Sequence, residues 1–85
     1  MIYEIEISAS AEKFLEKVPQ RDRLKIIEKI DALESTPLPI GCKKLQGHKE
    51  LYRLRSGDYR IIYTINKDRL LILVVEIGHR KEIYR

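Results

Sequence analysis

Five residues in the second half of the chain have side chains that could act together on a phosphate group: Arg53, Arg55, Arg60, Arg80 and Tyr84. A guanidinium group binds phosphate oxygens through a forked pair of N–H donors and stays charged at any relevant pH. Several arginines that converge on one phosphate would stabilise the added charge of a five-coordinate transition state. Nearby cations also favour a phenolate, so Tyr84 could exchange a proton with a ribose hydroxyl. Such a site needs no metal.

The stretch from Glu50 to Ile65 must position the first three arginines. Two runs rich in Tyr, Ile, Leu and Arg flank Ser56-Gly57-Asp58, which predicts two antiparallel strands joined by a tight turn. A two-residue turn at Gly57 and Asp58 predicts the opposite pairs Ser56–Tyr59, Arg55–Arg60, Leu54–Ile61, Arg53–Ile62 and Tyr52–Tyr63. A three-residue turn would instead mix apolar and charged side chains on both faces.

This register places Tyr52, Leu54, Ile61 and Tyr63 on one apolar face and Arg53, Arg55, Arg60, Leu51, Ile62 and Thr64 on the other. Like charges directly opposite each other are unfavourable in a sheet, so Arg55 and Arg60 would be stabilised by an anion between them. The alternative is that both arginines extend into solvent or pair with Glu and Asp side chains.

A third strand is predicted over residues 70–77, after a turn at Asn66-Lys67-Asp68. The run lacks alternation, which is typical of a central strand covered on both faces. Because it follows a short turn, it should pair antiparallel with residues 59–65. Its carboxyl end then lies beside Arg60, and Arg80 is brought towards that residue.

The first half of the chain predicts a strand over residues 1–7 and two helices. Ser8 or Ser10 is the expected N-cap of a helix that runs to about Val18, where Pro19 ends it. The second helix is expected over residues 21–33. Its predicted apolar stripe is Leu24, Ile27, Ile30 and Leu33, with Ile26 beside it, either as part of a wide core stripe or as apolar surface for a partner. The helical charges are read as a solvated surface.

The loop between the helices and the hairpin contains Pro37, Pro39 and Gly41 and continues through a basic segment with Lys43, Lys44 and Lys49. Together these elements predict an α+β fold and a single domain over residues 1–85. The order is an N-terminal strand, a two-helix hairpin and a three-stranded antiparallel meander. All strands are expected to form one sheet, with the helices on one face.

The charge is uneven along the chain. Residues 1–42 contain six Lys or Arg and eight Asp or Glu, a net charge of 6 − 8 = −2, whereas residues 43–85 contain eleven and five, a net charge of 11 − 5 = +6. Basic charge on the sheet suggests a polyanion such as nucleic acid, although a solvated basic surface would look the same.

Other classes of site have little support. One cysteine, Cys42, excludes an internal disulfide framework and suits a reducing compartment. There is no signal-peptide pattern and no apolar run of membrane-spanning length, so we expect a cytoplasmic protein without membrane contact. The two histidines, His48 and His79, are expected to be polar loop residues, and no metal or cofactor is predicted.

The order of elements, the block Leu51–Tyr63, and Gly78-His79-Arg80 followed by Tyr84 resemble the RelE/ParE superfamily of type II toxins over essentially the whole chain. The resemblance to the RelE branch implies a ribosome-dependent endoribonuclease that cuts mRNA in the ribosomal A site and leaves a cyclic phosphate. The implied catalytic residues are Arg60, Arg80 and Tyr84, and the implied RNA-binding residues are Arg53, Arg55, Lys43, Lys44 and Lys49.

The same resemblance implies an antitoxin partner with an amphipathic, acidic segment and a toxin–antitoxin hetero-oligomer, in addition to the ribosome and mRNA. Two alternatives stay open. One is a ParE-like inhibitor of DNA gyrase with the same fold, against which Arg80 and Tyr84 count because that branch does not depend on them. The other is a catalytically weak member that only binds RNA or a partner. Leu51 stands where relatives can carry a further lysine, which weakens the match at one position.

Overall fold

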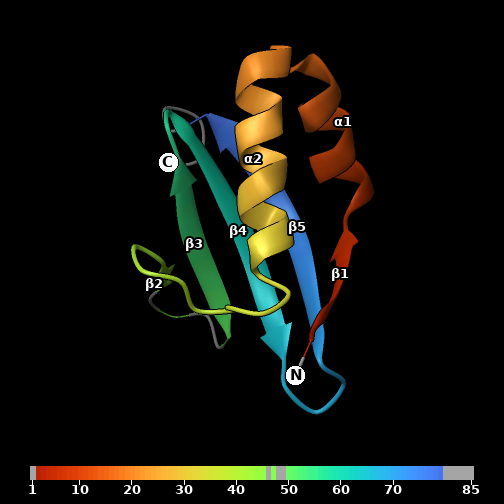
Figure 1. Ribbon diagram of the computed structural model, residues 1–85, viewed down its shortest axis with the longest axis vertical. Coiled ribbons are helices and arrows are strands. Elements are labelled where there is room, and N and C mark those ends of the chain that lie inside the picture. The colour runs from red at the N-terminus through yellow and green to blue at the C-terminus, as the bar shows by residue number, and fades with distance from the viewer. Residues whose placement is uncertain (1, 46, 48–49, 80–85) are drawn as a thin grey trace.

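The computed structural model describes residues 2–45, 47 and 50–79, which form two helices and five strands (Figure 1). In chain order these are β1 (Glu4–Ile7), α1 (Ala9–Lys17), α2 (Gln20–Ala32), β2 (Lys43–Lys44), β3 (Leu51–Ser56), β4 (Tyr59–Asn66) and β5 (Leu71–His79). The strands form one sheet in the order β1-β5-β4-β3-β2. Strand β1 runs parallel to β5, and the other neighbours are antiparallel.

Both helices lie against the same face of the sheet, α1 over β5 and α2 towards β3 (Figure 1). The predicted α+β fold and the three-stranded meander β3-β4-β5 are therefore confirmed. Strand β2 was missed, because a two-residue strand has no periodicity of its own. Lys43 and Lys44 were expected in a loop, and they instead pair with Arg53 and Tyr52 at the edge of the sheet.

The hairpin has the register that the sequence predicts. Residues Gly57 and Asp58 form the turn, Ser56 pairs with Tyr59, and the pairs continue without a shift to Leu51 and Thr64. Gly57 has a φ of +58°, in the left-handed region that L side chains rarely adopt. A glycine at this position therefore allows the tight turn that fixes which side chains share a face.

Helix α1 begins at a side-chain cap. The Ser8 hydroxyl accepts a hydrogen bond from the Ala11 amide at 3.1 Å, and it donates one to the Val75 carbonyl at 2.8 Å. The first bond satisfies an amide that has no partner within the helix, and the second ties the helix start to β5. Pro19 precedes α2, which starts at Gln20 without a side-chain cap.

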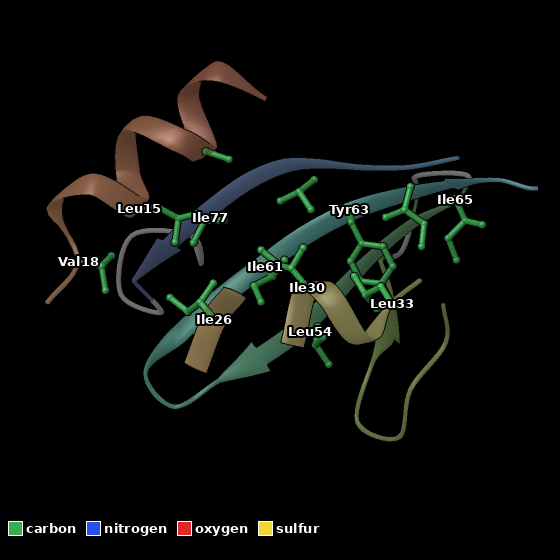
Figure 2. Packing of buried hydrophobic residues seen from close by; sticks show 13 residues of the cluster. Leu15, Val18, Ile26, Ile30, Leu33, Leu54, Ile61, Tyr63, Ile65 and Ile77 are labelled. Atoms are coloured by element: carbon green, nitrogen blue, oxygen red, sulfur yellow. The ribbon is translucent and has the colours of Figure 1, made fainter. Parts of the chain in front are cut away.

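The core lies between the helices and the facing side of the sheet (Figure 2). Helix α2 contributes Ile26, Ile30 and Leu33, whose spacing of four and three residues keeps them on one side of the helix. The predicted stripe was wrong at two of its four positions, since Leu24 is 57% exposed and Ile27 is 37% exposed, whereas Ile26 is fully buried. The helix is rotated so that Ile26 faces the sheet, which excludes Ile26 as apolar surface for a partner.

The sheet face turned away from α1 and α2 is here called the distal face. By register it carries Glu4, Glu6, Lys43, Leu51, Arg53, Arg55, Arg60, Ile62, Thr64, Leu71, Leu73, Glu76 and Gly78. Strand β5 is central, as predicted, but within the described ranges no helix covers its distal side, where Leu71, Leu73 and Val75 stay half-buried. The expectation of cover on both faces was wrong, because apolar side chains occupy the distal face of β5 although no described helix packs there. A bulge near Val75 also shifts the register of β5 against β4.

The loop before β2 is held to the sheet by Tyr63. This fully buried side chain donates a hydrogen bond from its hydroxyl to the Pro37 carbonyl at 2.8 Å, and its ring stacks on Tyr52. Burial raises the pKa of the Tyr63 phenol above its ordinary value, and Cys42 and Tyr52 nearby raise it further.

In the part of the chain that is described, no helix is long and apolar enough to span a membrane.

Candidate functional site

The start of β4 lies beside the end of β5. Arg60 is directly opposite Gly78, and Tyr59 is opposite His79, so the carboxyl end of β5 lies beside Arg60, as the sequence predicts. Arg80 comes two residues after Gly78. Arg80, Tyr84, Lys49 and His48 lie outside the described residues, so their roles in the site stay predictions.

Arg60 is buried, with 3% of its surface exposed. Its Nη1 donates to the Tyr59 carbonyl at 3.4 Å, and this is not its only interaction. Arg55, directly across the hairpin, is exposed. The opposition of the two arginines and their position on one face with Arg53 are confirmed, and the two residues differ in exposure, since Arg60 is buried and Arg55 is exposed.

The end of β5 is supported from the helix side by aromatic rings. The Tyr59 ring makes edge contacts with Phe14 of α1 at 6.1 Å and with His79 at 5.6 Å between ring centroids. His79 is therefore the half-buried last residue of β5, and the expectation of a polar loop residue was wrong. Since side chains alternate along a strand, His79 and Arg60 lie on opposite faces, which places His79 as support for the site.

A cleft of about 400 Å³ lies along the edge of β3. It is lined by Lys29, Ile40, Gly41, Lys43, Arg53, Leu54, Arg55 and Gly57. The cleft brings together three of the predicted RNA-binding residues, Lys43, Arg53 and Arg55. Lys44 is exposed but does not line it, because it alternates to the opposite side of β2.

Lys29 is the cleft residue that sequence reasoning missed. It lies on α2, where the alternating charges predict only a solvated surface, and its Nζ donates to the Arg55 carbonyl at 2.8 Å. No local pattern distinguishes Lys29 from Lys25 one turn earlier. Only the packing of α2 against β3 brings this amine to the hairpin.

Metal coordination has no candidate in the described part of the structure. Within residues 2–45, 47 and 50–79, no group of three His, Cys, Asp or Glu side chains is placed to hold an ion. The groups that the described site offers to a ligand are guanidinium and ammonium donors. These donors bind oxygen anions. The forked N–H donors of a guanidinium match two such anions well, phosphate and carboxylate.

Comparison with known proteins identifies the family. The family model described as ParE toxin of type II toxin-antitoxin system, parDE, matches residues 5–84. The chain belongs to this toxin family. The predicted resemblance to the RelE/ParE superfamily is thereby confirmed.

Individual relatives carry RelE names. The putative toxin RelE1 of Methanocaldococcus jannaschii is 31% identical, with 100% of this chain and 98% of the relative covered. The mRNA interferase toxin RelE of Escherichia coli is 27% identical, with 99% of this chain and 92% of the relative covered. Among solved structures, the archaeal RelE-RelB complex from Pyrococcus horikoshii matches with a TM-score of 0.84 and 33% identity, covering 94% of this chain and 97% of that chain. These names place the toxin in the RelE branch.

Proposed function

We propose that this toxin is an endoribonuclease that cuts mRNA in the ribosomal A site and so stops translation. The 2′-hydroxyl of one nucleotide attacks the adjacent phosphorus, the bond to the 5′-oxygen of the next nucleotide breaks, and the products are a 2′,3′-cyclic phosphate and a 5′-hydroxyl. The 2′-hydroxyl proton must be removed and a proton must reach the leaving 5′-oxygen. Both the P–O bond that forms and the P–O bond that breaks lie within the RNA, so the protein supplies position, charge and proton transfer.

In this proposal, Arg60 and Arg80 hold the scissile phosphate and stabilise its five-coordinate transition state. Tyr84 exchanges the proton with the ribose hydroxyl, and Arg53 and Arg55 bind the RNA backbone. The observation that carries the proposal is the pairing of Arg60 with Gly78, because Arg80 follows Gly78 by only two residues in the sequence. The E. coli relative named as an mRNA interferase supports the same activity.

Burial of Arg60 sets a condition on this mechanism. A residue that is 3% exposed offers almost no surface to RNA, so in this proposal binding of the message is coupled to a local rearrangement around Arg60. We propose that the change takes place on the ribosome. If Arg60 is uncovered only on the ribosome, the toxin should cut free RNA in solution much more slowly than mRNA on the ribosome.

We also propose that a cognate antitoxin binds this chain and forms a toxin–antitoxin hetero-oligomer, as RelE does with RelB in the Pyrococcus complex. An acidic, amphipathic segment would suit the net charge of +6 on residues 43–85 and would inhibit by covering the basic residues. The neighbouring reading frame tests this directly. A small adjacent gene whose product binds the toxin and restores growth is the expected finding.

The activity is tested by inducing the toxin in cells and mapping mRNA ends. Wild-type toxin should stop translation, with messages cut between codon positions, and Arg80→Ala or Tyr84→Ala should abolish both effects while antitoxin binding is retained. Arg69→Ala is the matched control, because Arg69 is exposed in the turn at the far end of the β4–β5 hairpin. If both tail variants stay fully toxic, the assigned catalytic residues are wrong.

Metal independence needs a separate test. A message with a sulfur in place of a non-bridging oxygen at the scissile phosphate reports on any metal that contacts this oxygen, because sulfur binds soft ions in preference to Mg²⁺. We expect slow cleavage that Mn²⁺ or Cd²⁺ does not restore. Restoration by either ion would contradict a mechanism that relies on arginines alone.

The second candidate is inhibition of DNA gyrase, which the ParE description of the matching family favours. The same induction experiment separates the two activities. DNA damage with intact messages would support the gyrase inhibitor, and cut messages without early DNA damage would support the endoribonuclease.

A further inference from the structure

The cleft along the edge of β3, here called the edge cleft, brings Lys29 of helix α2 next to the edge strands β2 and β3. The proposed catalytic site does not include Lys29. Its cations come from α2 (Lys29), β2 (Lys43) and β3 (Arg53 and Arg55), and no acidic side chain is among the lining residues that are described. Its remaining walls are two glycines and the apolar residues Ile40 and Leu54. Four cations around one open cleft repel each other, and an anion between them relieves this repulsion.

The backbone at this edge is already arranged around Lys29. Because Ser56 and Tyr59 flank a two-residue turn, they form a hydrogen-bonded pair, and the next pair, Arg55–Arg60, does not. The amide and carbonyl of Arg55 therefore point away from β4 towards the cleft, which agrees with the 2.8 Å bond from Lys29 Nζ to the Arg55 carbonyl. An ammonium group has three donors, so this bond fixes Lys29 at the cleft and leaves donor capacity for a ligand.

We infer that this cleft binds a backbone phosphate of RNA, separate from the phosphate that is cut. The inference rests on the proposed function and deepens it. Neighbouring strands lie about 5 Å apart, so the cleft on the outer side of β3 and Arg60 on β4 are separated by about one to two strand spacings. This distance suits nearby phosphates of a single RNA strand.

An acidic peptide added as a further strand is disfavoured at the same place. Strand addition uses the outward amide and carbonyl groups of an edge strand, and here the Arg55 carbonyl already accepts the bond from Lys29. Strand β2 pairs with the adjoining residues Tyr52 and Arg53. The cleft thus offers side-chain cations to a ligand, which is the arrangement that a phosphate needs.

The test uses the full chain with Lys29→Gln, Lys43→Gln and the double substitution. Each single substitution removes one charge from the cleft and the double substitution removes two, and every replacement keeps a polar side chain. In single-turnover cleavage of mRNA on programmed ribosomes, each single variant should raise the toxin concentration for half-maximal rate by about fivefold, and the maximal rate should change far less. A merely structural role would instead lower the thermal midpoint and the maximal rate together.

Lys25→Gln and Lys67→Gln are the matched controls. Lys25 lies one turn before Lys29 on α2, and Lys67 lies in the β4–β5 turn, and both are exposed and outside the cleft lining. Each control variant also loses one positive charge, and it should leave the toxin concentration for half-maximal rate nearly unchanged. If the controls weaken binding as much as the cleft variants, only net charge matters and the inference is overturned.

Direct binding separates this inference from the proposed function. A short single-stranded RNA with methylated 2′-hydroxyl groups cannot be cut, so its affinity depends on binding alone. The double variant should bind it more weakly, with a smaller dependence of affinity on salt, because fewer phosphates are neutralised. This result would stand even if the wild-type chain cut no message, and equal binding by wild type and double variant would overturn the cleft site.

Whether the bound phosphate belongs to mRNA or to ribosomal RNA can be tested by measuring the affinity of wild type and double variant for ribosomes with and without mRNA in the A site. A defect of the double variant only on programmed ribosomes supports a phosphate of the message, and a defect on both supports one of ribosomal RNA. If RNA affinity is unchanged and only antitoxin affinity falls, the cleft binds the acidic partner and our inference is wrong.

Discussion

Removal of the Tyr63 hydroxyl should destabilise the fold in a way that depends on pH. Tyr63→Phe deletes the 2.8 Å bond to the Pro37 carbonyl and keeps the buried ring. A lost hydrogen bond that leaves a partner unsatisfied lowers the free energy of unfolding by about 1–2 kcal/mol. Each kcal/mol corresponds to about 4–8 °C in Tm for a chain of this size.

The difference in free energy of unfolding between wild type and Tyr63→Phe should become smaller at alkaline pH. The pKa of Tyr63 lies above its ordinary value of 10.0 in the folded chain, so the folded chain keeps a proton that the unfolded chain loses. This contribution to stability is fully present below the unfolded pKa and is lost as pH rises towards the folded pKa. At about pH 11 the unfolded tyrosine is mostly ionised, and wild type has lost about 1.4 kcal/mol from this group, whereas the phenylalanine variant has lost none from that position.

Urea denaturation at a series of pH values measures both effects. The expected result is a gap of about 1–2 kcal/mol near neutral pH that has largely closed at about pH 11. Tyr52→Phe serves as the neutral-pH control, because it removes a hydroxyl from the same stacked pair without breaking the bond to Pro37. Parallel stability curves for wild type and Tyr63→Phe up to about pH 11 would refute the reasoning.

Three further substitutions test the fold by urea denaturation. Ile26→Ala should lower the free energy of unfolding by about 2–5 kcal/mol and Leu24→Ala by less than about 1 kcal/mol, because only Ile26 is buried, and equal losses would contradict the described rotation of α2. Ser8→Ala should cost about 1 kcal/mol, since it removes the cap of α1, and an unchanged midpoint would mean that the cap is replaced. Gly57→Ala should cost about 1 kcal/mol although the space around it is empty, because its φ is +58°, and a gain in stability would show that the turn adopts another shape.

The hairpin could be predicted residue by residue because its information is local. Alternation with a period of two and the turn at Gly57-Asp58 leave one register that keeps Tyr52 and Tyr63 on the apolar face, and the structure has that register. The short turn after β4 predicts antiparallel pairing of β5 with β4, and this pairing places the end of β5 beside Arg60. Short-range pairing thus fixed the position of the residue assigned to the phosphate.

The orientation of α2 could not be predicted in the same way. Leu24, Ile27, Ile30 and Leu33 form an apolar stripe at intervals of three, and Ile26, Ile30 and Leu33 form a second stripe that overlaps it. Which stripe is buried depends on how the helix meets the sheet, and that is a long-range property. Because the same rotation brings Lys29 to β3, the error about the core and the missed cleft residue have one cause.

The burial of Arg60 was not predictable from the pairing of Arg55 with Arg60. Register specifies which residues are opposite each other, but it does not specify what covers them. Arg55 lines the edge cleft, whereas Arg60 lies beside the end of β5. Like charges at opposite positions can therefore be accommodated by separate surroundings as well as by a shared anion.

The charges on the distal face give the proposed RNA path a direction. Glu4 and Glu6 lie at the β1 side, Glu76 follows on β5 opposite Ile62 of β4, and Arg53 and Lys43 lie at the β3 and β2 side. A polyanion is repelled at the first edge and attracted at the second. We therefore expect an RNA strand to approach from the β3 and β2 side, where the edge cleft lies. Binding at the exposed cations holds the strand near Arg60 but does not contribute to the step that uncovers Arg60, so substitutions in the cleft should raise the half-maximal toxin concentration and change the maximal rate far less.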